Sequence, residues 1–332
     1  MIISRAPFRI TLAGGGTDLP AFYSKYGGSV TSMAIDKYIY VSFKKNLLDT
    51  KVRLQYLRTE YVNKVDELTH DRAKAALKYF GILNNCEISS MADLPSRSGL
   101  GSSGSYLVAL INGLQEEQRK SFTKAEIAEL ACKIEITDLG EPVGKQDQYI
   151  ASYGGIQTFD IDRGGKVRAK ALTPSMEALE PFTERCRIYY TGVQRDASAV
   201  LRSQTRDQQN FEDKMLRIQA LSAPLLEALK SQDYDTYGQL LHRHWSFKKQ
   251  LSPRMTATIV DEIYNDLKTD RSILGGKIIG AGGGGFLMVY VPKEFNKVDT
   301  HMEQAGFIKI NYALNTTGVQ TIYNGDSYDN KS

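Results

Sequence analysis

Cysteine is scarce in this sequence, and its few copies lie far apart. The 332 residues include Cys86, Cys132 and Cys186, with no Cys-x-x-Cys pair among them. An odd number of isolated cysteines argues against both a disulfide framework and a zinc site. The sequence also has no apolar run long enough to cross a membrane and no signal-peptide core behind Met1. We therefore expect a protein of the reducing cytoplasm with no membrane partner.

Strong charge of one sign is missing as well. The formal net charge is +4, and the basic residues are scattered rather than gathered into a run. This argues against a nucleic-acid partner, whereas an anionic small molecule would suit the balance. The composition, 42% hydrophobic and 24% charged, is that of a globular protein, and the length allows two domains. We predict domains at 1–174 and 175–332. Nothing in the sequence specifies an oligomeric state.

What the sequence does have is glycine, gathered into three stretches. The middle one, residues 95–105, combines glycines with hydroxyls ahead of an apolar segment that predicts a buried helix. Such a loop presents unpaired N–H groups and the positive end of a helix dipole to one point, which suits phosphate. An ordinary Gly/Ser loop before a core helix is the alternative. The candidate nucleotide-binding residues are Pro95, Ser98, Gly99, Leu100, Gly101, Ser102, Ser103, Gly104 and Ser105.

The other two glycine-rich stretches flank this loop in the sequence. Gly14-Gly15-Gly16-Thr17-Asp18 ends in a hydroxyl and a carboxylate, which can grip a polyol; the alternative is that Asp18 caps a helix. Residues 280–285 lie between two apolar strands, so this third loop should be rigid and close to a ligand or another backbone.

Hydrophobic periodicity predicts several elements around these loops. We expect a strand over Ile2 to Leu12 broken at Pro7, and two strands within 28–44 around Asp36-Lys37. A capping box at Thr123 predicts a helix reaching 139, with Glu135 at the edge of its apolar stripe. A single helix is expected over 197–230.

Taken in order, the three glycine-rich motifs carry a family resemblance. Residues 6–18 resemble motif one of the superfamily of galactokinase, homoserine kinase, mevalonate kinase and phosphomevalonate kinase, the GHMP kinases. Residues 95–105 resemble the phosphate loop of that superfamily, Pro-x-x-x-Gly-Leu-Gly-Ser-Ser, and residues 277–285 resemble its third motif. Each match alone is weak, but all three in this order make a chance match improbable. Motif one and Gly-Lys-Gln-Asp-Gln at 144–148 look most like the D-glycero-D-manno-heptose 7-phosphate kinases.

The resemblance implies a fold and an activity. The fold would be α+β, with a ribosomal protein S5 domain 2-like N-terminal domain and a ferredoxin-like C-terminal domain. The activity would be ATP-dependent phosphorylation of the anomeric oxygen of a heptose phosphate, for the nucleotide-activated heptose of capsule or lipopolysaccharide. A kinase of another sugar, of the fucose or galactose type, is an alternative, and so is a non-catalytic sensor of sugar and nucleotide.

The resemblance also implies roles for individual residues. Asp147 matches the catalytic base or acceptor-orienting aspartate, and Arg9 the cationic residue beside it. Ser103 and Glu135 would hold Mg²⁺, which prefers oxygen ligands. The alternatives are an N-cap for Asp147, a structural ion pair for Arg9 and a surface charge for Glu135. The candidate substrate-binding residues are Arg9, Gly15, Gly16, Thr17, Asp18, Arg195, Arg202, Gly282 and Gly283. Either arginine of the pair at 195 and 202 could instead be a solvated helix charge, and His242, His244 and Trp245 are interpreted as packing.

Overall fold

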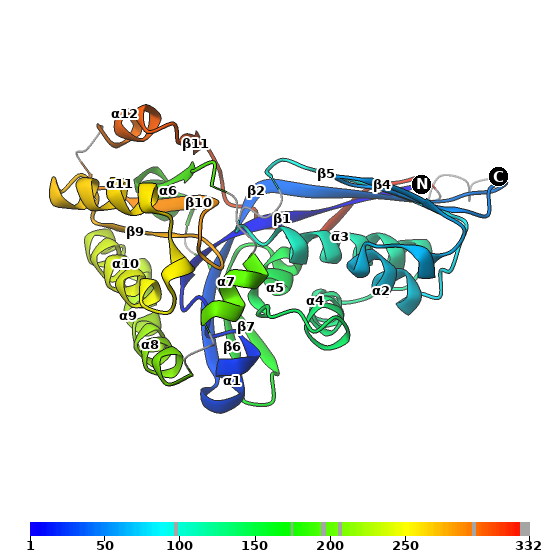
Figure 1. Ribbon diagram of the computed structural model, residues 1–332, viewed down its shortest axis with the longest axis horizontal. Helices are drawn as coiled ribbons and strands as arrows, with labels where there is room; N and C mark the ends of the chain where they lie inside the picture. Colours follow the sequence, from blue (N-terminus) through cyan, green and yellow to red (C-terminus); the bar gives the residue numbers. More distant parts are fainter. Residues whose placement is uncertain (96–98, 174, 194–196, 205–207, 294–296, 326–332) are drawn as a thin grey trace.

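A computed structural model describes residues 1–95, 99–173, 175–193, 197–204, 208–293 and 297–325. Two β-sheets organise the chain, one of eight strands and one of four (Figure 1). No helix within the described ranges is long and apolar enough to span a membrane.

The eight-stranded sheet is built around two long neighbouring strands. Its path is β12-β1-β2-β5-β3-β4, and β6 pairs with the other half of β2 and with β7. All pairs are antiparallel except β3 with β5. The strands are β1 (Ile2–Ala13), β2 (Gly28–Lys45), β3 (Val52–Gln55), β4 (Thr59–Val62), β5 (Cys86–Ala92), β6 (Ile156–Ile161), β7 (Val167–Leu172) and β12 (Gln320–Asn324).

The predicted breaks in the first two strands are wrong. β1 runs through Pro7, and the register against β2 shifts between Pro7 and Arg9. A proline removes one ladder donor, and a local irregularity of the pairing absorbs that loss without ending the strand. β2 likewise passes through Asp36 without a break, and Asp36 N–H donates to the carbonyl of Ala313 from the far end of the chain (2.9 Å).

Helices cover one face of this sheet (Figure 1). The central one, α3, is buried along most of its length and packs on β1 and β2. The predicted capping box is present, because Thr123 and Glu126 exchange hydrogen bonds. The helix that begins there is α-helical only to Cys132, where a π-helix takes over. The elements are α1 (Pro20–Tyr26), η1 (Val65–Glu67), α2 (Asp71–Tyr79), α3 (Ser102–Glu117), α4 (Lys124–Cys132), the π-helix η2 (Lys133–Asp138) and α5 (Gln146–Tyr153).

The second sheet is antiparallel throughout, in the order β11-β8-β10-β9. Helix 197–230 was expected as one element, but it is divided: a new helix begins at Ser222, whose first turn holds Pro224, a residue that suits a helix start and not an interior. The elements are α6 (Met176–Arg185), β8 (Cys186–Tyr190), α7 (Ala197–Gln204), α8 (Gln208–Ala220), α9 (Ser222–Lys230), α10 (Tyr234–Lys249), η3 (Pro253–Met255), α11 (Thr258–Thr269), β9 (Gly275–Ile278), β10 (Phe286–Tyr290), α12 (Lys297–Gln304) and β11 (Ile308–Ile310).

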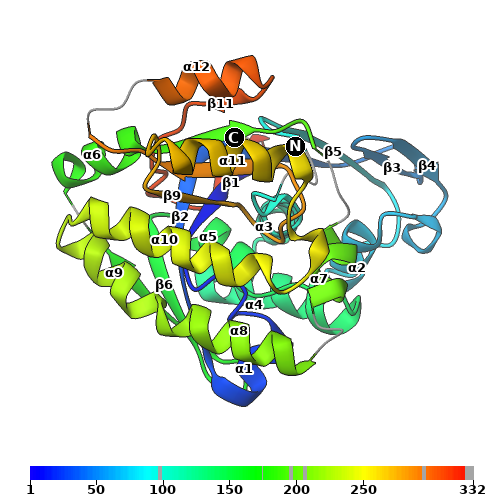
Figure 2. The same cartoon turned by 60° about the vertical axis from the view of Figure 1, so that its left-hand side comes forward.

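The two sheets share one apolar core. A single cluster of buried side chains joins Phe8 of β1 and Leu110 of α3 to Tyr237 of α10 and Tyr290 of β10. Helix α9 packs on β1 and β2, while α10 packs on β9, and Figures 1 and 2 both place α10 beside β9. The last strand, β12, returns to the first sheet and pairs with β1. The predicted domain boundary at 174 stays a prediction, and Pro174 itself lies outside the described residues.

Candidate active site

The three glycine-rich stretches meet at one cavity of about 1080 Å³. Motif one contributes Gly15 and Gly16 to its lining, and the third loop contributes Gly280 and Ala281. From the predicted phosphate loop, the residues that line it are Pro95, Gly99, Gly101, Ser102 and Ser103. Segments that are far apart in the sequence therefore face one space, as the resemblance implies.

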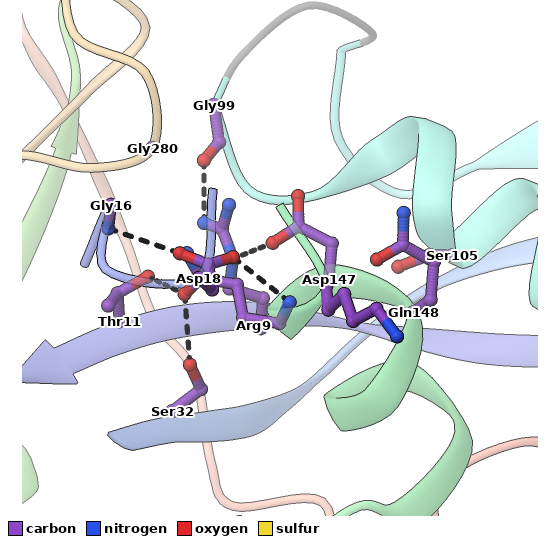
Figure 3. Close-up of polar contacts among 12 residues, drawn as sticks. Arg9, Thr11, Gly16, Asp18, Ser32, Gly99, Ser105, Asp147, Gln148 and Gly280 are labelled. Carbon is purple, nitrogen blue, oxygen red and sulfur yellow. Dashed lines mark hydrogen bonds and ion pairs between the residues drawn. The ribbon is translucent and has the colours of Figure 1, made fainter. Parts of the chain in front are cut away.

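Asp147 and Arg9 form an ion pair in this cavity. Arg9 lies on β1, is almost fully buried, and its Nε donates to Asp147 Oδ1 at 2.6 Å (Figure 3). Its Nη1 donates to the carbonyl oxygen of Gly99 at 2.7 Å, so the same guanidinium also holds the phosphate loop. Asp147 lies in the first turn of α5, and a quarter of its side chain is exposed to the cavity. Its carboxylate is therefore held in place but accessible.

Asp18 is bonded to the start of α5 and not to that of its own helix. Its Oδ2 accepts from the backbone N–H of Gln146 (3.1 Å), and its Oδ1 accepts from Gln146 Nε2 (3.2 Å) and from Gly16 N–H (3.1 Å) (Figure 3). The following helix α1 has Leu19 at its N-cap, so the local capping alternative is wrong. Gly144 leaves the necessary space, since a Cβ there would lie 1.9 Å from Asp18 Oδ2.

Gln146 is oriented by hydroxyls on the opposite side. Thr11 Oγ1 and Ser32 Oγ both donate to Gln146 Oε1, at 2.7 and 3.1 Å. Burial is the largest influence on Asp18 and raises the pKa of its carboxyl, and the negative charge of Asp147 acts in the same direction. Asp147, Asp18 and Arg9 are called the carboxylate cluster below.

The phosphate loop enters α3 through Gly101, whose φ of +83° places it in the left-handed region that favours glycine. Ser102 and Ser103 begin the helix and line the cavity. Ser105 is buried and its hydroxyl donates to the Pro7 carbonyl (2.8 Å), which gives it a structural contact. Leu100 is buried too, and Ser98 lies outside the described residues.

At Gly104 this helix lies close to α5. A Cβ at Gly104 would lie 2.9 Å from that of Asp147, so a larger residue would push the carboxylate aside.

The third loop touches the phosphate loop directly. A Cβ at Gly280 would lie 2.3 Å from the carbonyl oxygen of Gly99, so the two backbones are in contact there. Gly282 and Gly283, which were predicted to meet substrate, lie against another partner: Gly283 N–H donates to the Met255 carbonyl (2.7 Å). Neither is among the residues lining the cavity, to which this loop contributes Gly280 and Ala281.

Thr17 also has a structural contact, since its hydroxyl donates to the carbonyls of Gly14 and Ser29 (2.8 and 2.9 Å). Arg195 lies outside the described residues. Arg202 is exposed on α7, whose neighbouring residues Leu201 and Gln204 do line the cavity.

Glu135 is fully buried, so the alternative of a surface charge is wrong. It lies in the π-helix η2, and such insertions are frequent at functional sites. Its Oε1 accepts from Arg72 Nε at 2.7 Å, and its other carboxylate oxygen accepts from Gln148. Ser103 fits a magnesium site because its hydroxyl borders the cavity. Glu135 in this arrangement does not, because both its oxygens are engaged and Arg72, not Glu135, reaches the cavity.

An aromatic part of the lining was not predicted. The rings of Tyr56 and Tyr106 flank that of His70, with centroids 4.8 and 5.0 Å from it. Burial lowers the pKa of His70, and its Nδ1 accepts from Ala73 N–H at the start of α2. These three residues are spread over more than 50 positions of sequence, so no local pattern brings them together.

Two lysines of the lining were missed as well. Lys248 lies in the last turn of α10 and Lys277 lies on β9, and both are nearly fully buried. His244, one turn before Lys248, is buried behind them; it packs in the core as predicted, together with Trp245. Lys248, Lys277 and His244 are called the lysine cluster. A possible signal was the lysine that opens the third motif, but a lysine in a sequence usually indicates solvent exposure.

Comparison with known proteins gives a consistent picture. Residues 66–155 match the family model for the GHMP kinases N terminal domain. The chain is 28% identical to D-glycero-alpha-D-manno-heptose 7-phosphate kinase of Campylobacter jejuni, over 96% of this chain and 98% of that protein. It is 26% identical to L-fucokinase/L-fucose-1-P guanylyltransferase of Bacteroides fragilis, over 86% of this chain and 34% of that longer protein.

A solved structure is similar over the whole chain. The crystal structure of a D-glycero-D-manno-heptose 1-phosphate kinase from Bacteroides thetaiotaomicron has a TM-score of 0.78 and 22% identity, covering 98% of this chain and all of that one. The predicted resemblance and the predicted α+β fold are thereby confirmed.

Proposed function

We propose that this chain, whose residues 66–155 match the family model for the GHMP kinases N terminal domain, is an ATP-dependent kinase of a sugar phosphate. The GHMP kinases and the heptose-phosphate kinase relatives are phosphotransferases acting on sugar hydroxyl groups. The acceptor we propose is D-glycero-D-manno-heptose 7-phosphate, and the product its 1,7-bisphosphate, a precursor of nucleotide-activated heptose for surface polysaccharide. The relative from Campylobacter supports the acceptor. The name of the similar Bacteroides structure assigns the phosphates differently, so the position is a matter for experiment.

The observation that carries the proposal is the Asp147–Arg9 pair at the phosphate loop. Phosphoryl transfer forms a bond from the acceptor oxygen to the γ-phosphorus and breaks the bond to the β-phosphate oxygen, while the acceptor proton must leave. Asp147 is accessible and held at a fixed point, so it can take that proton. Arg9 keeps the carboxylate oriented and contributes positive charge toward the transferring group.

The cavity has suitable places for both substrates. The N–H groups and hydroxyls at Gly101, Ser102 and Ser103 suit the nucleotide phosphates, and the aromatic part of the lining around Tyr56 and His70 suits a base. Asp18 and the backbone near Gly16 suit sugar hydroxyls.

Bound magnesium would offset negative charge on the nucleotide phosphates. Ser103 is a ligand that fits; Glu135 could serve only if Arg72 released it.

A kinase for a free sugar of the fucose type is the second candidate, because a fucokinase matches 86% of this chain. The experiment is to measure ADP release with heptose 7-phosphate, free heptose, fucose and galactose. We expect heptose 7-phosphate to have a kcat/KM at least about 100-fold above that of free heptose, since two charge-assisted bonds to a phosphate, at about 1.5–3 kcal/mol each, correspond to roughly 10²–10⁴. Equal values for the two heptoses would reject the phosphorylated acceptor, and no turnover of any sugar would reject the sugar kinase.

A further inference from the structure

The lysine cluster combines deep burial with access to the cavity. Lys277 is 2% exposed and Lys248 7% exposed, yet both border the cavity. They come from different elements that pack together, β9 and α10. His244 is placed one helical turn before Lys248, on the same face of α10. The contact of α10 with β9 thus brings two lysine side chains to the cavity wall, with the imidazole of His244 buried outside the lining.

The charges near Lys277 do not balance it. Those that act on it come from Lys248 and Arg9, which are cations, and from the thiol of Cys186, whose own pKa burial raises to about 11. No ion pair of either lysine with a carboxylate occurs in the part of the chain that the structure describes. His244 is neutral, since burial lowers its pKa well below the usual value, and it supplies no negative charge.

Burying two lysines without a counter-charge lowers the stability of the folded protein when no ligand is bound. Burial is the largest influence on both lysines: it lowers the pKa of Lys248 to about 8 and that of Lys277 well below its usual range. A methionine would fill the same space with no charge to desolvate. An anionic group bound in the cavity would offset the positive charge of Lys248 and favour the charged form of Lys277.

The position of Lys248 indicates which part of the reaction is involved. Its Nζ donates to the carbonyl of Gly280 at 2.7 Å, where the third loop touches Gly99 of the phosphate loop. The carboxylates of Asp18 and Asp147, which line the same cavity, act to raise its pKa. Lys248 is therefore close both to the loops suited to the nucleotide and to the carboxylates suited to the acceptor.

We propose that Lys248 and Lys277 form a second phosphate-binding site of the cavity, separate from the glycine-rich phosphate loop. The positive charge of Arg9 adds to the electrostatic attraction of this site for an anion, although Arg9 Nε and Nη1 already donate to Asp147 and Gly99. As a ligand for two ammonium groups, a doubly charged phosphate is a better match than a carboxylate, which carries a single charge. The inference rests on the proposed kinase function, and the phosphate is either the terminal group of ATP or the phosphate of the acceptor.

The test compares Lys277→Met and Lys248→Met with Lys249→Met as a matched control. Methionine keeps the length of the side chain and removes the charge. Lys249 is the next residue on α10 but pairs with Asp261 at 3.2 Å, so its loss leaves the cavity charge unaltered. Each variant is assayed for ATP affinity by calorimetry and for kcat/KM with heptose 7-phosphate and free heptose. Arg202→Ala is included because Arg202 is a predicted substrate-binding residue and a second cationic side chain that could contact the acceptor phosphate.

We expect each of the two cavity variants to lose about 10- to 100-fold in one of these quantities. A loss of ATP affinity, with the preference for phosphorylated sugar kept, assigns the site to the nucleotide. A loss of that preference, with ATP affinity kept and Arg202→Ala normal, assigns it to the acceptor. Thermal unfolding without ligand should show both variants at least as stable as wild type, which a purely structural role of the lysines would not produce. Wild-type affinities and wild-type preference in both variants would overturn the proposal.

Inorganic phosphate separates this inference from the proposed function. Millimolar phosphate should raise the melting temperature of wild type and of Lys249→Met more than that of Lys277→Met. If no sugar is phosphorylated but this difference holds, the kinase proposal fails and the site stands. A different result would reject the site and keep the kinase proposal. In that case sugars are phosphorylated, but all variants have the same melting-temperature shift with phosphate, the same ATP affinity and the same preference for phosphorylated sugar.

Discussion

The two charged clusters at the cavity differ in how their charges are balanced. In the carboxylate cluster each charge has a partner: Arg9 pairs with Asp147, and Asp18 accepts three hydrogen bonds. In the lysine cluster, Lys248 has one carbonyl acceptor and is influenced by Asp18 and Asp147 without an ion pair to either, and the charged side chains that act on Lys277 are cations. A balanced cluster is already set in position for catalysis, whereas an unbalanced one is set to receive a charge from outside. The difference indicates that the first cluster orients groups and that the second binds a ligand.

The largest expected effect is on kcat, and it comes from removing the negative charge of Asp147 in the carboxylate cluster. Asp147→Asn should lower kcat by about 100-fold or more, because the amide cannot take the acceptor proton, while calorimetric ATP affinity changes little. The variant keeps the side-chain shape, so the fold should be retained. Near-normal turnover would remove Asp147 from the mechanism and leave it as the partner of Arg9.

The next prediction breaks the contact between the phosphate loop, which Arg9 of the first cluster bonds, and the third loop, which Lys248 of the second cluster bonds. Gly280 has a φ of +79°, and an alanine there would also place a Cβ 2.3 Å from the Gly99 carbonyl. Gly306 has a similar φ of +77° with no atom within 4 Å of such a Cβ, so it serves as the control. Gly280→Ala should therefore lower the free energy of unfolding by about 1–3 kcal/mol more than Gly306→Ala, as measured in urea. Equal losses would show that the loops do not depend on this contact.

A third change tests the buried contacts of Glu135, which accepts hydrogen bonds from Arg72 and from Gln148, the residue after Asp147. Glu135→Gln should lower the free energy of unfolding by about 1–2 kcal/mol, because Arg72 loses the negative charge of its buried partner, while its ion pair with Glu141 at 3.2 Å stays. Asp138→Asn, in the same π-helix but in an exposed pair with Lys133, should change stability by less than about 0.5 kcal/mol.

A magnesium titration of the Glu135→Gln rate examines the other proposed role of this residue. If Glu135 ligates magnesium in the working enzyme, half-maximal activity should need about tenfold more magnesium than in wild type. An unaltered titration curve would limit Glu135 to holding Arg72.

The smallest expected effect is the pH dependence of the unfolding free energy that Lys248 of the lysine cluster contributes. The pKa of Lys248 is lowered to about 8 in the folded protein, so the unfolded chain binds more protons above that pH and folding becomes more favourable as pH rises. Between pH 7 and 9 this adds about 1 kcal/mol to the stability of wild type. Lys248→Met lacks this gain, so the difference in unfolding free energy between the two proteins should change by that amount. A difference that is independent of pH would mean that Lys248 titrates in its usual range.

The sequence alone predicted the features that depend on neighbouring residues. The glycine loops, the capping box at Thr123 and the family resemblance are all local patterns of a few residues. They also indicated Asp147 and Arg9, which the structure places 2.6 Å apart. The local patterns failed where tertiary pairing overrides them, as in the unbroken strand through Pro7 and the π-helix that turns Glu135 into the interior.

Only the tertiary structure decided which charges are buried. Lys248 and Lys249 are adjacent and chemically identical in the sequence, and nothing local separates them. The packing of α10 against β9 buries the first beside Lys277, while the second reaches Asp261 near the surface. Burial follows from which helix face meets another element, and that is determined by the whole arrangement of the sheets. The residues of the local motifs were therefore predictable from the sequence, and the lysine cluster was not.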